Sequence, residues 1–252
     1  MTVTRRQLVR LPRVAAIVCA VLLIAATAAA QPRFSIAVNG GYQPTTSEFD
    51  DGFMIELFEE GGNTDVHYPI EAGALFDVGG GVRLWRGLGA GVAISRFVRD
   101  GVASTTSLIP HPFFFRRFRE VAGNAGGMER EETGVHLHAR YDLPLTRRLH
   151  LTLMGGPSFL RIDQRIVTEV NYTEEYPYDT ATFTGVDSRV VDGSATGFNA
   201  GVDVRWMFTE SIGAGALVRF TRATVDLEPR QNRTIPVDAG GMHIGVGGRF
   251  LF

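Results

Sequence analysis

The sequence predicts an all-β protein, an eight-stranded antiparallel up-and-down transmembrane β-barrel with short periplasmic turns and long extracellular loops. Three observations support this prediction. From residue 34 onward, stretch after stretch alternates apolar with small or polar residues, and helical periodicity is almost absent. Eight such stretches can be counted, an even number that lets an antiparallel sheet close on itself. The connections between them are short and long in turn.

The strands are expected where one face is apolar and the other is glycine-rich or polar. In the clearest case Ile212, Val218 and Phe220 alternate with Gly213 and Arg219. The same reading gives eight strands over residues 34–42, 68–84, 87–99, 129–143, 148–170, 193–208, 211–226 and 238–252.

The connections fall into two classes. Three are tight, at residues 85–87, 144–147 and 209–210, and four are long, at roughly 43–67, 100–128, 171–192 and 227–237. Short turns at one end and long loops at the other are typical of bacterial transmembrane barrels. A soluble barrel or sandwich remains the alternative, because periodicity alone does not say which face points inward.

The first thirty residues have the composition of an export signal. Residues 1–13 are basic, residues 14–27 are apolar, and Ala28 to Ala30 supply a small-residue cleavage pattern. We therefore expect a signal peptide over residues 1–30 and the β-barrel over residues 31–252, with an uncleaved anchor as the alternative. Cys19, the only cysteine, lies inside this segment, so the mature chain would have no disulfide and no thiolate site.

The polar face decides in favour of a membrane barrel. An eight-stranded barrel is just wide enough for side chains to fill its interior, and buried charges are tolerated only in pairs. We expect a lumenal network that closes the pore. Its predicted members are Asp77, Arg83, Arg140, Asp203, Arg205, Arg219 and Arg249.

Net charge excludes one class of partner. All 25 basic residues are Arg; four of them precede residue 31, which leaves 21 against 27 acidic residues, a net charge of −6. That balance does not suit a nucleic-acid-binding protein.

The chain ends on Gly247, Gly248, Arg249, Phe250, Leu251 and Phe252. This end resembles the assembly signal of outer-membrane barrels, with Phe250 and Phe252 at alternate positions, although Gly245 stands where that signal has a polar residue. The mature region as a whole resembles the small eight-stranded outer-membrane barrels of the OmpA, OmpX and OmpW type. The resemblance implies an outer-membrane location, export through the Sec pathway and insertion by the barrel assembly machinery.

One long loop interleaves aromatic and basic residues. Its Phe113, Phe114, Phe115, Arg116, Arg117 and Arg119 suit contact with lipopolysaccharide phosphates, with the rings at the membrane interface, or packing on a neighbouring loop. The acidic and aromatic stretch over residues 172–183 could cap the barrel by facing this loop, or bind an external partner.

No motif indicates a cofactor, a metal or an enzyme. The glycines at 87, 89 and 91 open a strand rather than a helix, so they do not form a phosphate loop. His136 and His138 share a strand face with no clear third ligand, and Ser95 beside His136 has no supporting local motif.

The predicted function is a structural or surface-recognition role in the outer membrane: membrane integrity, lipopolysaccharide contact or adhesion through loops. The alternatives are a narrow channel or carrier for small hydrophobic molecules and, third, a lipid-modifying enzyme. The expected partners are outer-membrane lipid, lipopolysaccharide and, during biogenesis, the barrel assembly machinery. We expect a monomer that binds no nucleic acid.

Overall fold

The computed structural model describes residues 34–252, so the predicted signal peptide over residues 1–30 lies outside the described residues. Twelve strands make up this part of the chain, and eight of them close into a barrel in the order β1-β12-β11-β10-β9-β8-β5-β4. The barrel strands are β1 (Phe34–Gln43), β4 (Gly73–Trp85), β5 (Leu88–Arg99), β8 (Arg130–Pro144), β9 (Leu149–Glu174), β10 (Ala181–Met207), β11 (Ile212–Arg230) and β12 (Arg233–Leu251). Every neighbouring pair in the ring is antiparallel. The predicted eight-stranded barrel is confirmed.

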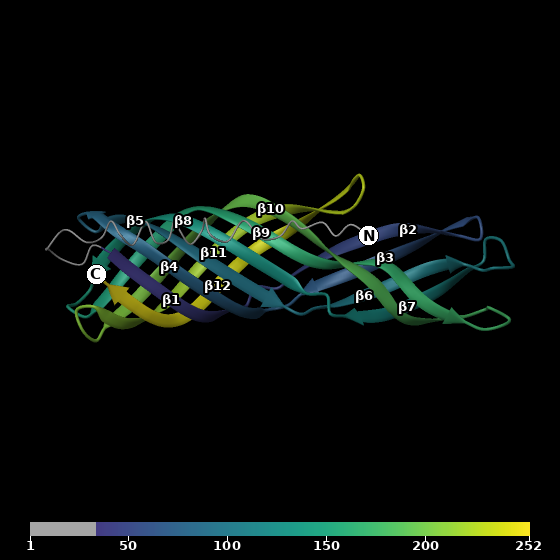
Figure 1. Cartoon of the computed structure of the whole chain (residues 1–252), viewed down its shortest axis with the longest axis horizontal. Coiled ribbons are helices and arrows are strands. Elements are labelled where there is room, and N and C mark those ends of the chain that lie inside the picture. Colours follow the sequence, from purple (N-terminus) through teal and green to yellow (C-terminus); the bar gives the residue numbers. More distant parts are fainter. Residues whose placement is uncertain (1–33) are drawn as a thin grey trace, which may run out of the picture.

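The remaining four strands form a separate sheet, β2-β3-β6-β7. They are β2 (Ser47–Leu57), β3 (Glu60–Ile70), β6 (Val102–Pro110) and β7 (Phe118–Gly126). Figure 1 shows this sheet beyond one end of the barrel, beside the long β9–β10 hairpin. The described chain has no helix long and apolar enough to cross a membrane.

The predicted strand over residues 68–84 is wrong in its first part. Residues 60–70 belong to β3 of the separate sheet, and β4 begins only at Gly73. The long connections are present, but they are built mainly of strands. Residues 43–67 and 100–128 contain the β2–β3 and β6–β7 hairpins, and β9 to β12 continue through most of 171–192 and 227–237.

The opposite end of the barrel, which we call the turn end, carries the short connections and the C-terminus (Figure 1). The β4–β5 turn illustrates how the sequence encodes them. Arg86 and Gly87 both have positive φ, 44° and 90°, as the two central residues of a tight hairpin require. Glycine adopts this conformation without a side-chain clash.

The barrel carries an apolar outer surface that we call the belt. On β11 its residues are Ile212, Ala214, Ala216, Val218 and Phe220, all exposed, whereas Arg219 between them is buried. The run from Ile212 to Phe220 covers nine residues, the length with which a tilted strand spans the hydrocarbon core.

Exposed aromatic side chains border the belt at both edges. Trp85, Tyr141, Trp206, Phe208 and Phe252 lie towards the turn end, and Tyr42, Phe76, Phe159, Phe198 and Phe220 lie towards the other edge. The rings of Phe198 and Phe220 touch, with centroids 6.1 Å apart. Two aromatic girdles around an apolar band are the surface that a barrel presents to a bilayer.

Beyond the belt the polarity of the strands reverses. On β11 the outward residues become Arg222, Thr224 and Asp226, and the buried residues become Val225 and Leu227. The same change follows Phe159 on β9, precedes Phe198 on β10 and precedes Met242 on β12. We call this part the extension: β2, β3, β6 and β7 with residues 160–174, 181–197, 222–230 and 233–241.

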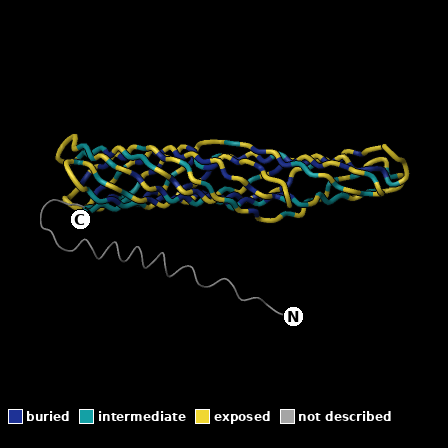
Figure 2. Tube along the Cα trace, turned by 90° about the horizontal axis from the view of Figure 1, so that it is seen from above, coloured by how far each residue is buried: buried dark blue, intermediate teal, exposed yellow. Residues whose placement is uncertain are grey.

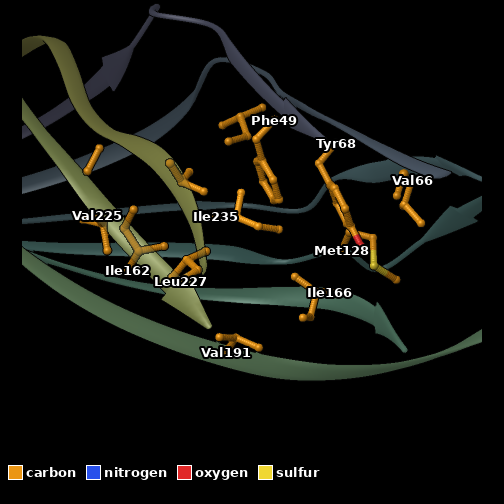
Figure 3. Packing of buried hydrophobic residues seen from close by; sticks show 14 of the residues in the cluster. Phe49, Val66, Tyr68, Met128, Ile162, Ile166, Val191, Val225, Leu227 and Ile235 are labelled. Atoms are coloured by element: carbon orange, nitrogen blue, oxygen red, sulfur yellow. The ribbon is translucent and has the colours of Figure 1, made fainter. Parts of the chain in front are cut away.

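The extension encloses the main apolar core of the molecule (Figure 3). Phe49 and Tyr68 stack in it at 4.6 Å, and the Tyr68 hydroxyl accepts a hydrogen bond from the Val167 backbone N–H at 2.8 Å. Burial raises the pKa of Tyr68 to about 12. In Figure 2, buried residues run through both parts of the elongated molecule, and the ends are exposed. The two parts therefore form one continuous body with opposite polarity inside.

Two contacts fix the separate sheet to the barrel strands. Asp51 on β2 forms ion pairs with Arg230 at 2.8 Å and Arg233 at 3.0 Å. On the other side Gly123 of β7 lies so close to the Phe183 ring that a Cβ would come within 2.2 Å of it. The sheet is thus held along both of its edges.

Candidate functional site

Two regions gather chemically active side chains: the lumen of the barrel and the outer tip of the extension. In the lumen, Asp77 accepts hydrogen bonds from Asn39 at 3.0 Å and from Arg219 at 2.6 Å. Arg249 pairs with the Asp203 carboxylate through its Nε, at 3.0 Å, and through a second guanidinium nitrogen. Four of the residues predicted for the lumen thus meet in two ion pairs.

A third group lies nearest the turn end. Arg140 contacts Asp142 at 3.0 Å, and Arg205 lies 3.6 Å from the same carboxylate. Thr152 also donates to Asp142, at 2.6 Å. Asp142 is absent from the network predicted from the sequence, although its spacing of two residues from Arg140 places both side chains on one strand face. Arg83 lines the cavity beside this group.

A row of hydrogen bonds and a contact between two histidine rings cross the middle of the lumen. His136, fully buried, contacts the Ser95 and Ser158 hydroxyls, each at 2.8 Å. The His243 ring centroid lies 6.1 Å from that of His136, and Arg219 contacts His243 at 3.2 Å. Among residues 34–252, no group of three His, Cys, Asp or Glu side chains is arranged to hold a metal.

These side chains leave little open volume. One cavity of about 50 Å³ lies among Asn39, Asp77, Arg219 and Arg249, and another of about 90 Å³ lies at the turn-end mouth. Next to the lumen, the apolar core of the extension continues the filled interior. The interior is packed along most of its length.

The ladder between β8 and β9 is interrupted in the barrel wall. It pairs His136 with Ser158 and then resumes at Ala139 with Gly155 in the same register, so the pairs Leu137–Pro157 and His138–Gly156 are skipped. Proline has no N–H to donate to a ladder. The Asn199 side-chain Nδ2, which carries two hydrogens, instead lies 3.1 to 3.3 Å from the carbonyl oxygens of Leu137, Gly156 and Pro157 and 2.9 Å from the Ser158 hydroxyl.

At the far end of the extension, three hairpin tips meet (Figure 1). Arg117 pairs with Asp179 at 2.8 Å, and the Arg116 backbone N–H donates to Glu60 at 2.8 Å. Arg119 is buried and pairs with Glu174. These contacts join the β2–β3, β6–β7 and β9–β10 tips into one unit, which we call the tip: residues 56–60, 111–120 and 174–179.

The tip leaves its aromatic side chains in solvent. Phe113, Phe114 and Phe115 are 68%, 54% and 73% exposed, and Tyr176 is 83% exposed. Phe113 meets Tyr178 edge-on at 5.5 Å. The predicted contact between the basic loop and the acidic 172–183 stretch therefore occurs here, far from the barrel opening.

The tip also lies far from the belt. From Phe159, at the edge of the belt, to Glu174 there are fifteen residues of β9, roughly 50 Å along the strand. The phenylalanine rings of residues 113–115 thus lie far from the belt, whereas one of the two alternatives drawn from the sequence placed them at the membrane interface and the other placed them against a neighbouring loop.

The two residues of the predicted assembly signal lie at the turn end. Phe250 faces outward on β12, and Phe252 pairs through its backbone with Phe34, so the C-terminus closes the ring against β1.

The chain is similar to known proteins in its structure and not in its sequence. No protein-family model matches the chain, and no curated protein matches its sequence. The outer membrane protein OprG of Pseudomonas aeruginosa is 9% identical with a TM-score of 0.48, over 88% of this chain and 97% of its own. The outer membrane protease OmpT of Escherichia coli is 10% identical with a TM-score of 0.46, over 90% and 100%.

Neisserial surface protein A is 13% identical with a TM-score of 0.44, over 87% of this chain and 97% of its own. The eight-stranded closed ring decides the architecture. The fold is a closed, eight-stranded antiparallel β-barrel. At these identities and TM-scores the likenesses carry no inference about activity, substrate or partner.

Proposed function

We propose that this chain is an outer-membrane barrel that carries a rigid recognition head, the extension, outside the cell. The supporting observation is the tip, where two ion pairs and a hydrogen bond from the Arg116 backbone N–H to Glu60 join three hairpins and hold Phe113, Phe114 and Phe115 in solvent. Aromatic and arginine side chains dominate the binding energy of protein interfaces. Because the tip is already held in place, a partner would not have to order it.

Charge supports a protein partner over lipopolysaccharide. The tip contains seven carboxylates, on Glu56, Glu59, Glu60, Glu120, Glu174, Glu175 and Asp179, against the three guanidinium groups of Arg116, Arg117 and Arg119. Its net charge is therefore negative and repels the phosphates of lipopolysaccharide. A partner with an apolar pocket and a basic rim fits this surface.

The packed lumen weighs against the channel alternative. The two cavities of about 50 and 90 Å³ are separated from the outside by the apolar core of the extension. The break in the wall at Pro157 is the one observation that favours lateral exit of a small hydrophobic molecule, and Asn199 closes it. The enzyme alternative would need a serine beside a histidine, and the Ser95 hydroxyl does contact His136 at 2.8 Å. Both side chains are buried, which weighs against access of a substrate to them.

The test is adhesion of bacterial cells that display the chain. Replacing Phe113, Phe114 and Phe115 with Ser should lower adhesion to immobilised extracellular-matrix proteins by at least about tenfold, as the loss of hot-spot anchors does. A matched control replaces Val102, Leu108 and Val190, exposed apolar residues of the extension outside the tip, with Ser. This control should adhere as the wild type does.

Two outcomes would contradict the proposal. The first is equal adhesion of the tip variant and the wild type. The second is a steady ion conductance of the purified wild-type protein in a planar bilayer that survives the tip substitutions, which would favour the channel.

A further inference from the structure

The turn-end mouth of the lumen holds more positive than negative charge. Arg140 and Arg205 share a single carboxylate, Asp142, at 3.0 and 3.6 Å. All three side chains are at least nine-tenths buried, with relative exposures of 10%, 9% and 9%. A buried charge without a counter-charge is costly, so this arrangement calls for a further anion.

The other lumenal carboxylates among the described residues are already engaged. Asp203 is held by Arg249, and Asp77 is held by Arg219 and Asn39. At the mouth itself, the Nε atoms of Arg140 and Arg205 are buried and make no hydrogen bond. Each of these two buried guanidinium groups thus keeps one N–H without an acceptor.

An open space lies beside these donors. The mouth cavity has a volume of about 90 Å³, and its polar lining consists of Ser35, Arg83, Arg140, Asp142, His150 and Arg205, three arginines against one carboxylate. A buried water needs about 15 Å³ by the same measure, so the cavity has room for roughly six water-sized centres. A tetrahedral oxyanion, with five heavy atoms, fits this volume.

The arginines surround the cavity rather than lining one side of it: Arg83 lies on β4, Arg140 on β8 and Arg205 on β10. The Ser35 hydroxyl on β1 donates to the Gly81 carbonyl and accepts a hydrogen bond from Arg140, so it holds Arg140 in place. A carboxylate presents its lone pairs in one plane, whereas a phosphate accepts hydrogen bonds from several directions. Guanidinium forks match phosphate oxygens in pairs.

We propose that the mouth cavity is a binding site for a phosphate group, with Arg205 and Arg140 as its main ligands and His150 at its rim. The phosphate supplies the negative charge that Asp142 alone does not. Two sources share this chemistry: soluble phosphate or a phosphomonoester, and a phospholipid headgroup. The site lies at the opposite end of the molecule from the tip, so it does not depend on the recognition role.

The test is calorimetric titration of the full chain, folded in a maltoside detergent and a chloride buffer, with inorganic phosphate. We expect one saturable site. Arg205→Gln should weaken phosphate binding by about tenfold or more, the value of a charged hydrogen bond in a buried site. Arg205→Lys keeps the positive charge but loses the paired N–H donors of the planar guanidinium group. Its affinity for phosphate should therefore lie between those of the wild type and Arg205→Gln. The matched control Arg222→Gln, at an exposed position on the extension, should bind as the wild type does.

The folding of each variant is checked first, by a band that shifts on boiling in an electrophoresis gel. If Arg205→Gln does not fold, the comparison of Arg205→Lys with the wild type replaces it. No saturable phosphate binding, equal affinity in the wild type and the Arg205 variants, or acetate binding as tightly as phosphate would each overturn the proposal. A short-chain phosphatidylglycerol that binds more tightly than phosphate and needs Arg205 would identify the headgroup as the source; weaker binding would identify the soluble anion.

Discussion

The barrel and the extension share the strands β9 to β12, which run through both parts but bury opposite kinds of residue in each. Along β11 the buried residues change from Arg219 and Thr221 to Val225 and Leu227, while the outward residues change from Val218 and Phe220 to charged ones. The backbone does not change: both parts are antiparallel ladders. The medium outside decides which residues face it, lipid for the belt and water for the extension.

This comparison separates two ways of holding a sheet together. The extension is stabilised by burial of apolar area, at about 25 cal/mol per Å². The barrel interior is held by paired charges and hydrogen bonds, whose net gain is small but whose disruption is costly. Mutations of the same kind should therefore have different effects in the two parts.

The largest effect is expected when one member of a lumenal pair is removed. Asp77→Ala leaves Arg219 buried without its partner, which costs about 3–5 kcal/mol. Asp163→Ala on the extension breaks the exposed Arg161–Asp163 pair and should cost at most about 1 kcal/mol. Urea unfolding, followed by the heat-dependent gel shift, measures both; equal costs would remove the distinction between the two parts.

A cavity in the extension is expected to come next. Ile162 is fully buried in the apolar core, and Ile162→Ala should cost about 2–5 kcal/mol. Limited proteolysis should then cut the extension while the barrel keeps its heat-dependent gel shift. Loss of that shift together with the extension would mean that the two parts unfold as one unit.

A charge on the outer surface tests the edge of the belt. Val218→Arg places a charge in the bilayer and should cost about 2–4 kcal/mol. Asp226→Arg is the same kind of change, outward on the same strand and eight residues further along, and should be near neutral because it faces water. Folding into lipid vesicles is the appropriate measurement, and a neutral Val218→Arg would show that the belt does not face lipid.

The break in the barrel wall should have a smaller cost. Asn199→Ala removes the amide that bonds the carbonyl groups beside Pro157, and leaving buried acceptors unpaired costs about 1–3 kcal/mol. Hydrogen exchange should increase on β8 and β9 around residues 137–157 and stay unchanged in the extension. Uniform protection would contradict the role given to Asn199.

The smallest effect concerns pH and lies in the extension. Because burial raises the pKa of Tyr68 to about 12, the folded protein resists its ionisation, and the unfolded chain ionises first. The stability that Tyr68 contributes is complete below pH 10 and is lost as the pH rises towards 12. Absorbance titration of the six tyrosines should show a late component that Tyr68→Phe removes; its persistence in that variant would contradict the assignment.

The sequence predicted the barrel because its alternation is strong and uniform there. The separate sheet lies mostly in residues expected as loops, because β6 alternates Ala103, Thr105 and Ser107 with Ser104 and Thr106, so small polar residues occupy both faces. The available signal was Leu227, one residue past the expected strand 211–226, and the alternating Ile235 and Val237 just before the expected strand 238–252. Reading these as strands required the expectation that polarity can reverse along one strand.

The lumenal candidates could be named from one strand face at a time, but their partners could not. Asp77 lies on β4 and Arg219 on β11, 142 residues apart in the chain, and the pairing depends on the size and stagger of the closed ring. The tip was harder still, because Arg119, Glu174 and Glu60 come from three hairpins. Sequence periodicity carries no information on how separate hairpins meet.

The β9–β10 hairpin runs from the turn end of the barrel to the tip, with paired residues from Leu149 and Trp206 to Glu174 and Ala181 and two small register shifts. A partner that pulls on the tip would load these two strands along their length. Both strands would then carry the force side by side in tension, and no force would slide one past the other. The molecule therefore has the construction of a mechanical tether, in which a force applied at the tip would pass directly into the barrel ring.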